Sequence, residues 1–330
     1  STIYDGETVD ARLAKSGWSR PEFDSSSWPK VAIADYPLSD LVAIESEPVV
    51  IHQRIKPVKV ITTPAGEKVL DFGQNLVGRE VVTYKGKPGQ KIVISHAEVL
   101  DEKGNFYTVN LRSAKAQSTY ICSGEEDHFE PKFTFYGFRY LRVEGIEGEL
   151  NPDNFEAAVI FSNIAENGNF SSSNELVNQL QSNIQWGLTG NFLDVPTDCP
   201  QRDERLGWTG DTQAFCGTAS YNGDVKGFFH KWLQDARDSQ TEEGMYPDVI
   251  PAMDSVGYGG SAWGDAGVIV PYIIWKMYAD TSIISEHYDS MEKYMGWLAT
   301  TNCDGPRATY GDWLAYEPTD RRFISVAYYA

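Results

Sequence analysis

The pattern of apolar residues changes near residue 165, and this change most constrains the fold. Before it, short segments rich in β-branched and aromatic residues are separated by turns, without helical periodicity between them. Short strands at this spacing predict an antiparallel β-sandwich, which we assign to residues 42–165. The predicted strands are residues 49–55, 68–72, 80–86, 91–99, 118–122, 139–146 and 157–161.

After residue 165 the periodicity becomes helical. Apolar residues recur every four positions from Leu176 to Leu188, which predicts an amphipathic helix, and Ser172 with Glu175 has the spacing of a capping box at its start. Long helices joined by loops rich in Gly, Asp and Trp predict an α/α array over residues 166–330, with functional loops at one end. Further helices are predicted to begin near Asp224 and to span residues 265–279 and 282–299.

The first 41 residues contain too few predicted strands to close a sheet of their own. They are typical of the edge of another β domain. We therefore expect residues 1–41 to be the tail of an upstream domain, in a native chain that begins earlier.

Charge and apolar length exclude several classes of partner. The net charge of −19 disfavours nucleic acid and anionic membranes, because an acidic chain repels both. The longest apolar stretch, residues 267–279, is shorter than the roughly 20 residues that a spanning helix needs. It also contains Pro271 and Lys276, so a buried helix is the prediction.

The cysteines and aromatic residues bear on compartment and ligand. None of the four cysteines forms a CxxC pair, so we expect no metal site and reduced thiols, which favours a cytoplasmic location while leaving the compartment open. Aromatic residues reach 13%, which suits surfaces that stack against sugars, although most of these rings are expected in the core.

Residues 196–211, PTDCPQRDERLGWTGD, hold four carboxylates and two arginines around one tryptophan. Three interpretations are open for this loop. It could be a solvated salt-bridge network that pairs Arg202 and Arg205 with Asp203 and Glu204. It could bind Ca²⁺ through carboxylate oxygens, although its spacing matches no EF-hand. It could provide a general acid for sugar chemistry, which requires a carboxyl whose pKa is raised by burial or by neighbouring carboxylates.

The run DCPQRDERLGWTGD resembles the signature of the bacterial α-L-rhamnosidases of glycoside hydrolase family 78. LDFGQNLVGR and FEPKFTFYGFRYLRVEG resemble the β-sandwich that precedes the family's catalytic domain. SAWGDAGVIVPY and YGDWLA resemble the early part of its (α/α)6 barrel, and TIYDGETVDARL resembles the tail of its N-terminal β domain. The resemblance thus covers nearly the whole chain, and it implies a β-sandwich followed by about the first half of an (α/α)6-barrel catalytic domain.

The resemblance implies roles for residues at matching positions. Glu204 falls on the family's general acid, and Trp208 on an aromatic residue of the same pocket. An apolar wall would receive the C5 methyl group of rhamnose, while carboxylates would bind its hydroxyl groups. The implied sugar-binding residues are Asp198, Arg202, Trp208, Asp211, Trp263, Asp265 and Trp313.

The family inverts the anomeric carbon, which needs a second carboxylate as base. That base comes from late in the family's barrel, so we expect it beyond residue 330 and expect these residues alone to be an inactive fragment, with substitution by Asp265 as the alternative. The implied partners are rhamnose-containing glycosides, with no cofactor; a homo-oligomer is left open. Two rivals are an α/α-barrel hydrolase or lyase for another sugar, and a non-catalytic carbohydrate-binding protein.

Overall fold

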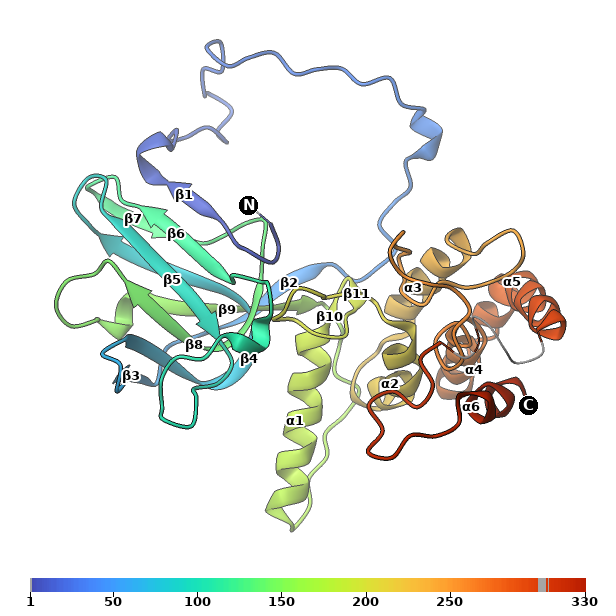
Figure 1. Ribbon diagram of the computed structural model, residues 1–330. Coiled ribbons are helices and arrows are strands. Elements are labelled where there is room, and N and C mark those ends of the chain that lie inside the picture. Colours follow the sequence, from blue (N-terminus) through green and yellow to red (C-terminus); the bar gives the residue numbers. More distant parts are fainter. Residues whose placement is uncertain (1, 302–306, 308) are drawn as a thin grey trace.

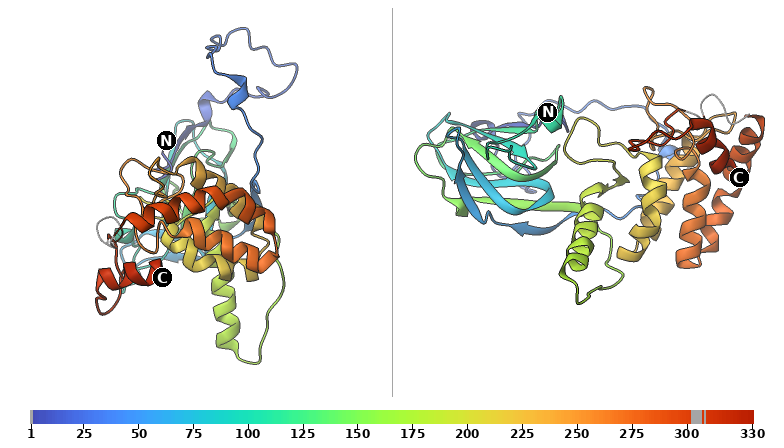
Figure 2. Two further views of the ribbon diagram at one scale, coloured as in Figure 1. Left: turned by 90° about the vertical axis from the view of Figure 1, so that its right-hand side faces the viewer. Right: turned by 60° about the horizontal axis from the view of Figure 1, so that its bottom comes forward.

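The computed structural model describes residues 2–301, 307 and 309–330. The sheet and the helices occupy separate parts of the molecule (Figure 1). Helix α1 lies between them in Figure 1 and in the right-hand view of Figure 2, and it packs against strands β4 and β9. The change of sequence pattern near residue 165 therefore coincides with the change from sheet to helix.

The sheet has nine strands in the order β1-β6-β5-β8-β4-β9-β2, with β3 and β7 also paired to β4. Neighbouring strands are antiparallel except for β1 and β6, which run parallel. The strands are β1 (Thr8–Asp10), β2 (Val49–Ile55), β3 (Lys59–Thr62), β4 (Lys68–Lys85), β5 (Lys91–Ala97), β6 (Gln117–Ile121), β7 (Glu126–Phe129), β8 (Tyr136–Glu144) and β9 (Phe155–Ser162).

Strand β4 joins two segments that the sequence predicts as separate strands. Its first part pairs with β8, and its pairing register shifts between Asp71 and Leu76. This irregularity bends the strand without ending it, and the later part pairs with β9 and β7. The predicted antiparallel sandwich is therefore confirmed only in part, because strands β1 to β9 form one hydrogen-bonded sheet that includes a parallel pair.

The helical part has its own apolar core, which includes Phe228, Trp232, Val270 and Tyr294. Helix α4 packs against α2, α3 and α5. A short hairpin of β10 (Phe192–Leu193) and β11 (Val195–Pro196) follows the first helix. The helices are α1 (Glu175–Asn191), α2 (Thr209–Asn222), α3 (Lys226–Asp238), α4 (Ala266–Tyr278), α5 (Thr281–Thr300) and α6 (Arg321–Tyr329).

The start of α1 differs from the predicted capping box. Asn174 is the N-cap, and its side chain accepts a hydrogen bond from the Leu176 amide at 2.9 Å. The Ser172 hydroxyl instead donates to the Asn174 carbonyl. An Asn side chain caps as well as Ser, so the helix begins after Asn174. The sequence also missed α2, whose first residues belong to the charged run 196–211.

Cys122, Cys199 and Cys216 are buried free cysteines, and Cys303 lies outside the described residues, so the predicted reduced state of the thiols stays a prediction. In the described part of the chain, every helix is too short or too polar to cross a bilayer.

Candidate functional site

The charged loop lies between β11 and α2 and is closed by Asp198. The Asp198 amide donates to the Leu206 carbonyl, and the Leu206 amide donates back to Asp198 Oδ1, both at 2.9 Å. Asp198 Oδ2 accepts a hydrogen bond from Arg202 Nη2 at 2.8 Å. The loop is thus an ordered turn whose carboxylate and arginine have fixed positions.

Contacts from the sheet part hold the loop from outside. Arg205, only 5% exposed, donates to the carbonyl oxygens of Ile3 and Phe135 at 2.6 and 2.7 Å. The Tyr4 hydroxyl donates to the Glu204 carbonyl at 2.9 Å. The predicted pairing of Arg205 with Asp203 or Glu204 is therefore wrong, because its guanidinium is buried against main-chain carbonyls.

At two positions of the loop only glycine fits, because a larger residue would clash with a neighbouring group. A Cβ atom on Gly207 would lie 2.1 Å from the Ile250 carbonyl oxygen, and one on Gly210 would lie 2.6 Å from Cε2 of Trp263. Both distances are shorter than any tolerable carbon contact. The glycines therefore let the first turn of α2 approach Trp263 and bring the loop to the wall of a cavity.

This cavity has a volume of about 570 Å³. It gathers every sugar-site residue predicted from the sequence except Asp265. The sequence missed Arg112, Tyr310 and Leu314, of which Tyr310 begins the quoted run YGDWLA, whereas Arg112 belongs to no motif. The lining residues are Arg112, Asp198, Arg202, Glu204, Trp208, Asp211, Trp263, Tyr310, Trp313 and Leu314.

Aromatic rings form one wall of the cavity. The rings of Trp263 and Tyr310 lie 4.3 Å apart between centroids, and Trp313 meets each of them edge-on at 6.5 and 6.2 Å. Trp208 contacts Tyr310 edge-on at 5.8 Å. Trp263 is 7% exposed, whereas Trp313 is 63% exposed. The wall therefore combines a packed base with an accessible outer ring.

Glu204 faces this wall and accepts hydrogen bonds on both oxygens. Trp208 Nε1 donates to Oε1 at 2.9 Å, while Arg202 Nε and Arg112 Nη2 donate to Oε2 at 3.0 and 2.9 Å. Burial alone would raise the pKa of Glu204, but the hydrogen bonds from Arg202 and Arg112 more than offset it and leave the pKa below its ordinary value.

The neighbouring aspartates show the opposite shift. Burial raises the pKa of Asp198, and the charge of Glu204 adds to the rise. Desolvation and the charges of Asp198 and Glu204 also raise the pKa of Asp211. Asp211 is exposed at the cavity, so solvent reduces this rise relative to that of Asp198. The sequence argument required a raised pKa at the acid, Glu204, and in the free protein this expectation is wrong because two arginines hold its carboxylate.

Asp265 has a different environment from the other predicted residues. It is 4% exposed, and its oxygens accept hydrogen bonds from Arg307 Nη1 at 2.9 and 3.0 Å. The Tyr294 hydroxyl and the Ala262 amide donate to the same carboxylate. Asp265 thus lies beneath the turn that carries Trp263, where it joins helices rather than lining the cavity.

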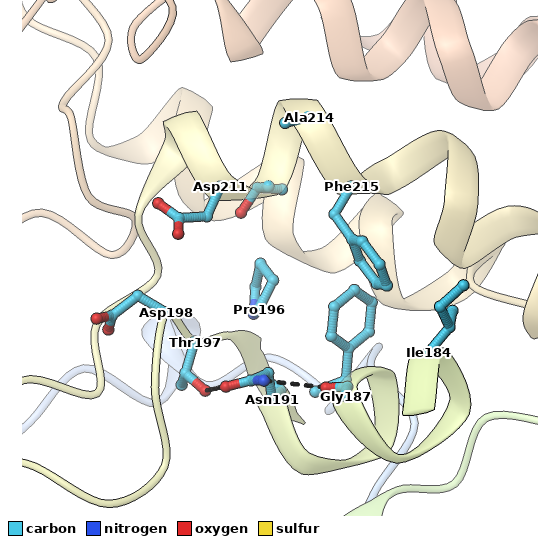
Figure 3. A pocket seen from close by; sticks show the side chains of 11 residues that line it. Ile184, Gly187, Asn191, Pro196, Thr197, Asp198, Asp211, Ala214 and Phe215 are labelled. Atoms are coloured by element: carbon cyan, nitrogen blue, oxygen red, sulfur yellow. Dashed lines mark hydrogen bonds between the residues drawn. The ribbon is translucent and has the colours of Figure 1, made fainter. Parts of the chain in front are cut away.

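A second groove of about 410 Å³ adjoins the cavity and shares Asp198 and Asp211 with it. Figure 3 shows these two carboxylates on one side of the groove and the apolar side chains of Ile184 and Phe215 on the other. The aspartates therefore stand at the boundary between a polar cavity and an apolar groove.

One set of side chains among the described residues has the spacing of metal ligands, namely Asp198, Cys199 and Glu204. Burial, with the charge of Asp198, raises the pKa of the Cys199 thiol to about 12, so this sulfur is protonated in the metal-free protein. Both carboxylates already accept hydrogen bonds from Arg202. The donor set therefore fits an ion-pair network better than a metal.

Carboxylates, arginines and an aromatic wall around one cavity are the groups expected in a protein that binds a sugar. Three family models match the chain in succession: an α-L-rhamnosidase N-terminal domain over residues 1–53, a bacterial α-L-rhamnosidase concanavalin-like domain over residues 61–161, and a bacterial α-L-rhamnosidase 6 hairpin glycosidase domain over residues 165–330. The chain belongs to the bacterial α-L-rhamnosidase family.

Individual relatives agree with this assignment. An α-L-rhamnosidase of Streptomyces avermitilis is 41% identical over 99% of this chain, and one of Formosa agariphila is 39% identical over 100% of it. The crystal structure of the Streptomyces avermitilis enzyme complexed with L-rhamnose matches with a TM-score of 0.93 at 40% identity, covering 99% of this chain. The α-L-rhamnosidase from Dictyoglumus thermophilum matches equally well, with a TM-score of 0.93 at 36% identity, also covering 99%.

The matched part is a limited share of these relatives. The chain spans 32% and 37% of the two curated relatives, and 32% and 38% of the two solved chains. It therefore corresponds to about a third of a typical relative.

Proposed function

We propose that the whole protein containing this chain is an inverting glycoside hydrolase that releases terminal α-L-rhamnose from rhamnosides. The observation that carries this proposal is the cavity itself, which gathers Glu204, its neighbouring carboxylates and the aromatic wall. The crystal structure of a relative with L-rhamnose supports the choice of sugar.

In this proposal Glu204 is the general acid. Its carboxyl proton passes to the glycosidic oxygen as the bond from that oxygen to the anomeric carbon breaks, and the bonding electrons stay on the leaving oxygen. Asp198, Asp211 and Arg202 bind sugar hydroxyl groups. The rings of Trp263 and Trp313 receive the apolar face of the sugar and its C5 methyl group.

Inversion also needs a carboxylate base roughly 6.5–9.5 Å from the acid, on the opposite face of the sugar. This base takes a proton from a water molecule, and the water oxygen forms the new bond to the anomeric carbon as the bond to the leaving oxygen breaks. Asp265 is a poor substitute, because Arg307 and Tyr294 already occupy its oxygens. We assign the base to the part of the relatives' length that this chain does not span. The proposed activity is accordingly that of the whole protein, and we expect residues 1–330 alone to be inactive.

The test uses the full-length protein and a panel of nitrophenyl glycosides together with a natural rhamnoside. We expect a preference for α-L-rhamnosides, and we expect Glu204→Gln to lower turnover of the natural rhamnoside by roughly 10²–10⁴-fold. The loss should be smaller for the nitrophenyl substrate, whose good leaving group needs less protonation.

Two outcomes would favour other functions. Preferential hydrolysis of another glycoside would assign the site to a different sugar. Rhamnose binding without hydrolysis by the unmodified protein would indicate a binding protein. Full activity of Glu204→Gln on the natural rhamnoside would instead move the acid role to Asp198 or Asp211, whose pKa values are raised.

A further inference from the structure

Arg112 is a cavity residue that comes from the sheet part rather than from the charged loop. It follows a 3₁₀ turn at Val109–Leu111 in the connection between β5 and β6. Its backbone has φ 57° and ψ −115°, a combination that side-chain-bearing residues rarely adopt. Such strain persists where surrounding contacts impose it, and it occurs often at functional sites.

The guanidinium of Arg112 holds two consecutive carboxylates. Its Nε donates to Asp203 Oδ1 at 2.6 Å, and its Nη2 donates to Glu204 Oε2 at 2.9 Å. The next residue, Ser113, donates to Asp203 Oδ2 through its amide at 3.3 Å and through its hydroxyl. Asp203 therefore anchors Arg112 independently of Glu204.

A general acid must carry a proton when its substrate is bound, yet three donors here favour the ionised form of Glu204. Two of them are firmly held: Arg202 is also tied to Asp198, whose side chain is 5% exposed, and Trp208 packs in the aromatic wall. Arg112 is 50% exposed and keeps its Asp203 contact if it leaves Glu204. Arg112 is thus the donor that Glu204 can lose at least cost.

We propose that Arg112 is a positioning residue of the rhamnosidase site: its guanidinium holds Glu204 in the free protein and passes entirely to Asp203 when a sugar enters the cavity. This inference rests on the proposed function. Glu204 then takes a proton from solvent, and no other covalent bond changes. The sheet part would in this way orient the acid before binding and release it for proton transfer afterwards.

Other charges near Glu204 must be considered in any pH argument. Burial raises the pKa of Glu204, and hydrogen bonds from Arg202, Arg112 and Trp208 lower it. The charge of Glu204 in turn raises the pKa values of Asp198 and Asp211. The charged groups that face it are Arg112 from the sheet part, Arg202, Asp198 and Asp203 from its own loop, and Asp211 from α2.

The experiment compares pH profiles of the full-length protein and Arg112→Gln on a natural rhamnoside. The pH dependence of kcat/KM reports groups in the free protein, and that of kcat reports groups in the substrate complex. Loss of Arg112 should raise the pKa of Glu204 in the free protein only. We expect the alkaline limb of kcat/KM to move up by about 0.5–1 pH unit, while that of kcat stays in place.

Arg12→Gln is the matched control. Arg12 is equally exposed, at 50%, and pairs with Asp10 at 2.7 Å outside the cavity. The alkaline limbs of both kcat/KM and kcat should therefore stay in place in Arg12→Gln. Arg112→Lys keeps the charge but lacks the planar fork of the guanidinium, so its alkaline limb of kcat/KM should lie between those of the unmodified protein and Arg112→Gln. It also serves as the test if Arg112→Gln does not fold.

The outcomes separate this inference from the proposed function. Equal movement of both limbs would show that Arg112 stays on Glu204 throughout, and movement of neither would show that it does not act on the acid; each result overturns the inference. Absence of rhamnoside hydrolysis in the unmodified protein, or full activity of Glu204→Gln, would instead overturn the proposed function.

Discussion

Two arginine–carboxylate clusters in this molecule use the same chemical groups in opposite ways. Asp265 and Arg307 are 4% and 0% exposed, and their hydrogen bonds join the turn before α4 to α5 and α6 through Tyr294 and Ser325. Glu204 and Arg112 have side chains that are 22% and 50% exposed, and they face a cavity.

The difference lies in what each cluster can exchange. A buried charge pair cannot be separated without leaving a charge in a medium of low dielectric constant, so it forms a permanent structural contact between the elements that it joins. At the cavity, water or a sugar hydroxyl can replace one partner at little cost. Burial therefore separates the structural carboxylate from the functional one, although the sequence motifs suggest a sugar-site role for both.

The strongest test of this comparison is Asp265→Asn. The substitution leaves the buried Arg307 without its carboxylate, and we expect a loss of about 3–5 kcal/mol in the free energy of unfolding. Chemical denaturation of the full-length protein measures it. Glu204→Gln is the matched comparison and should change stability far less.

A milder variant keeps this test informative if Asp265→Asn does not fold. Tyr294→Phe removes the hydroxyl that donates to Asp265 at 2.9 Å and should cost about 1 kcal/mol. A stable Asp265→Asn protein that has lost rhamnose binding would contradict the comparison and return Asp265 to the sugar site.

The sequence predicted those parts of the molecule that depend on local pattern. Periodicity located the sheet and the helical region, because each follows from neighbours in the chain. It missed the continuity of β4, because a bulge that bends a strand contains the same types of residue as a turn that ends one. It also missed Arg112, because a contact across 92 positions with Glu204 leaves no local signal. The burial that distinguishes Asp265 from Asp211 is likewise a tertiary property.

The second prediction concerns acid stability, which should depend on the helical core rather than on the cavity. Burial, with the charges of Arg237 and His230, lowers the pKa of His287 to about 3. The unfolded chain then binds a proton more readily than the folded one, so stability is lost as pH falls from about 6.5 toward 3. We expect a loss on the order of 2 kcal/mol near pH 5, and His287→Phe should remove most of it.

His128 provides the control for this prediction, because it lies exposed on the sheet and its replacement by Phe removes a histidine without opening the helical core. Denaturation midpoints of the proteins, measured between neutral and mildly acidic pH, give the comparison. An equal acid loss in the unmodified protein and in His287→Phe would assign the sensitivity to other groups, such as the cavity carboxylates.

The smallest expected effect is the loss of rhamnose binding at the exposed end of the aromatic wall. Trp313 is 63% exposed, so Trp313→Ala should weaken rhamnose binding by roughly tenfold, about 1.4 kcal/mol, with little change in melting temperature. Trp263 is 7% exposed and packs on Tyr310, so Trp263→Ala should also cost about 3–5 kcal/mol of stability.

Calorimetric titration with rhamnose and thermal melts of both full-length variants measure the two effects. If Trp313→Ala lowers stability as much as Trp263→Ala while keeping its rhamnose affinity, the outer ring is structural and exposure does not distinguish the two tryptophans.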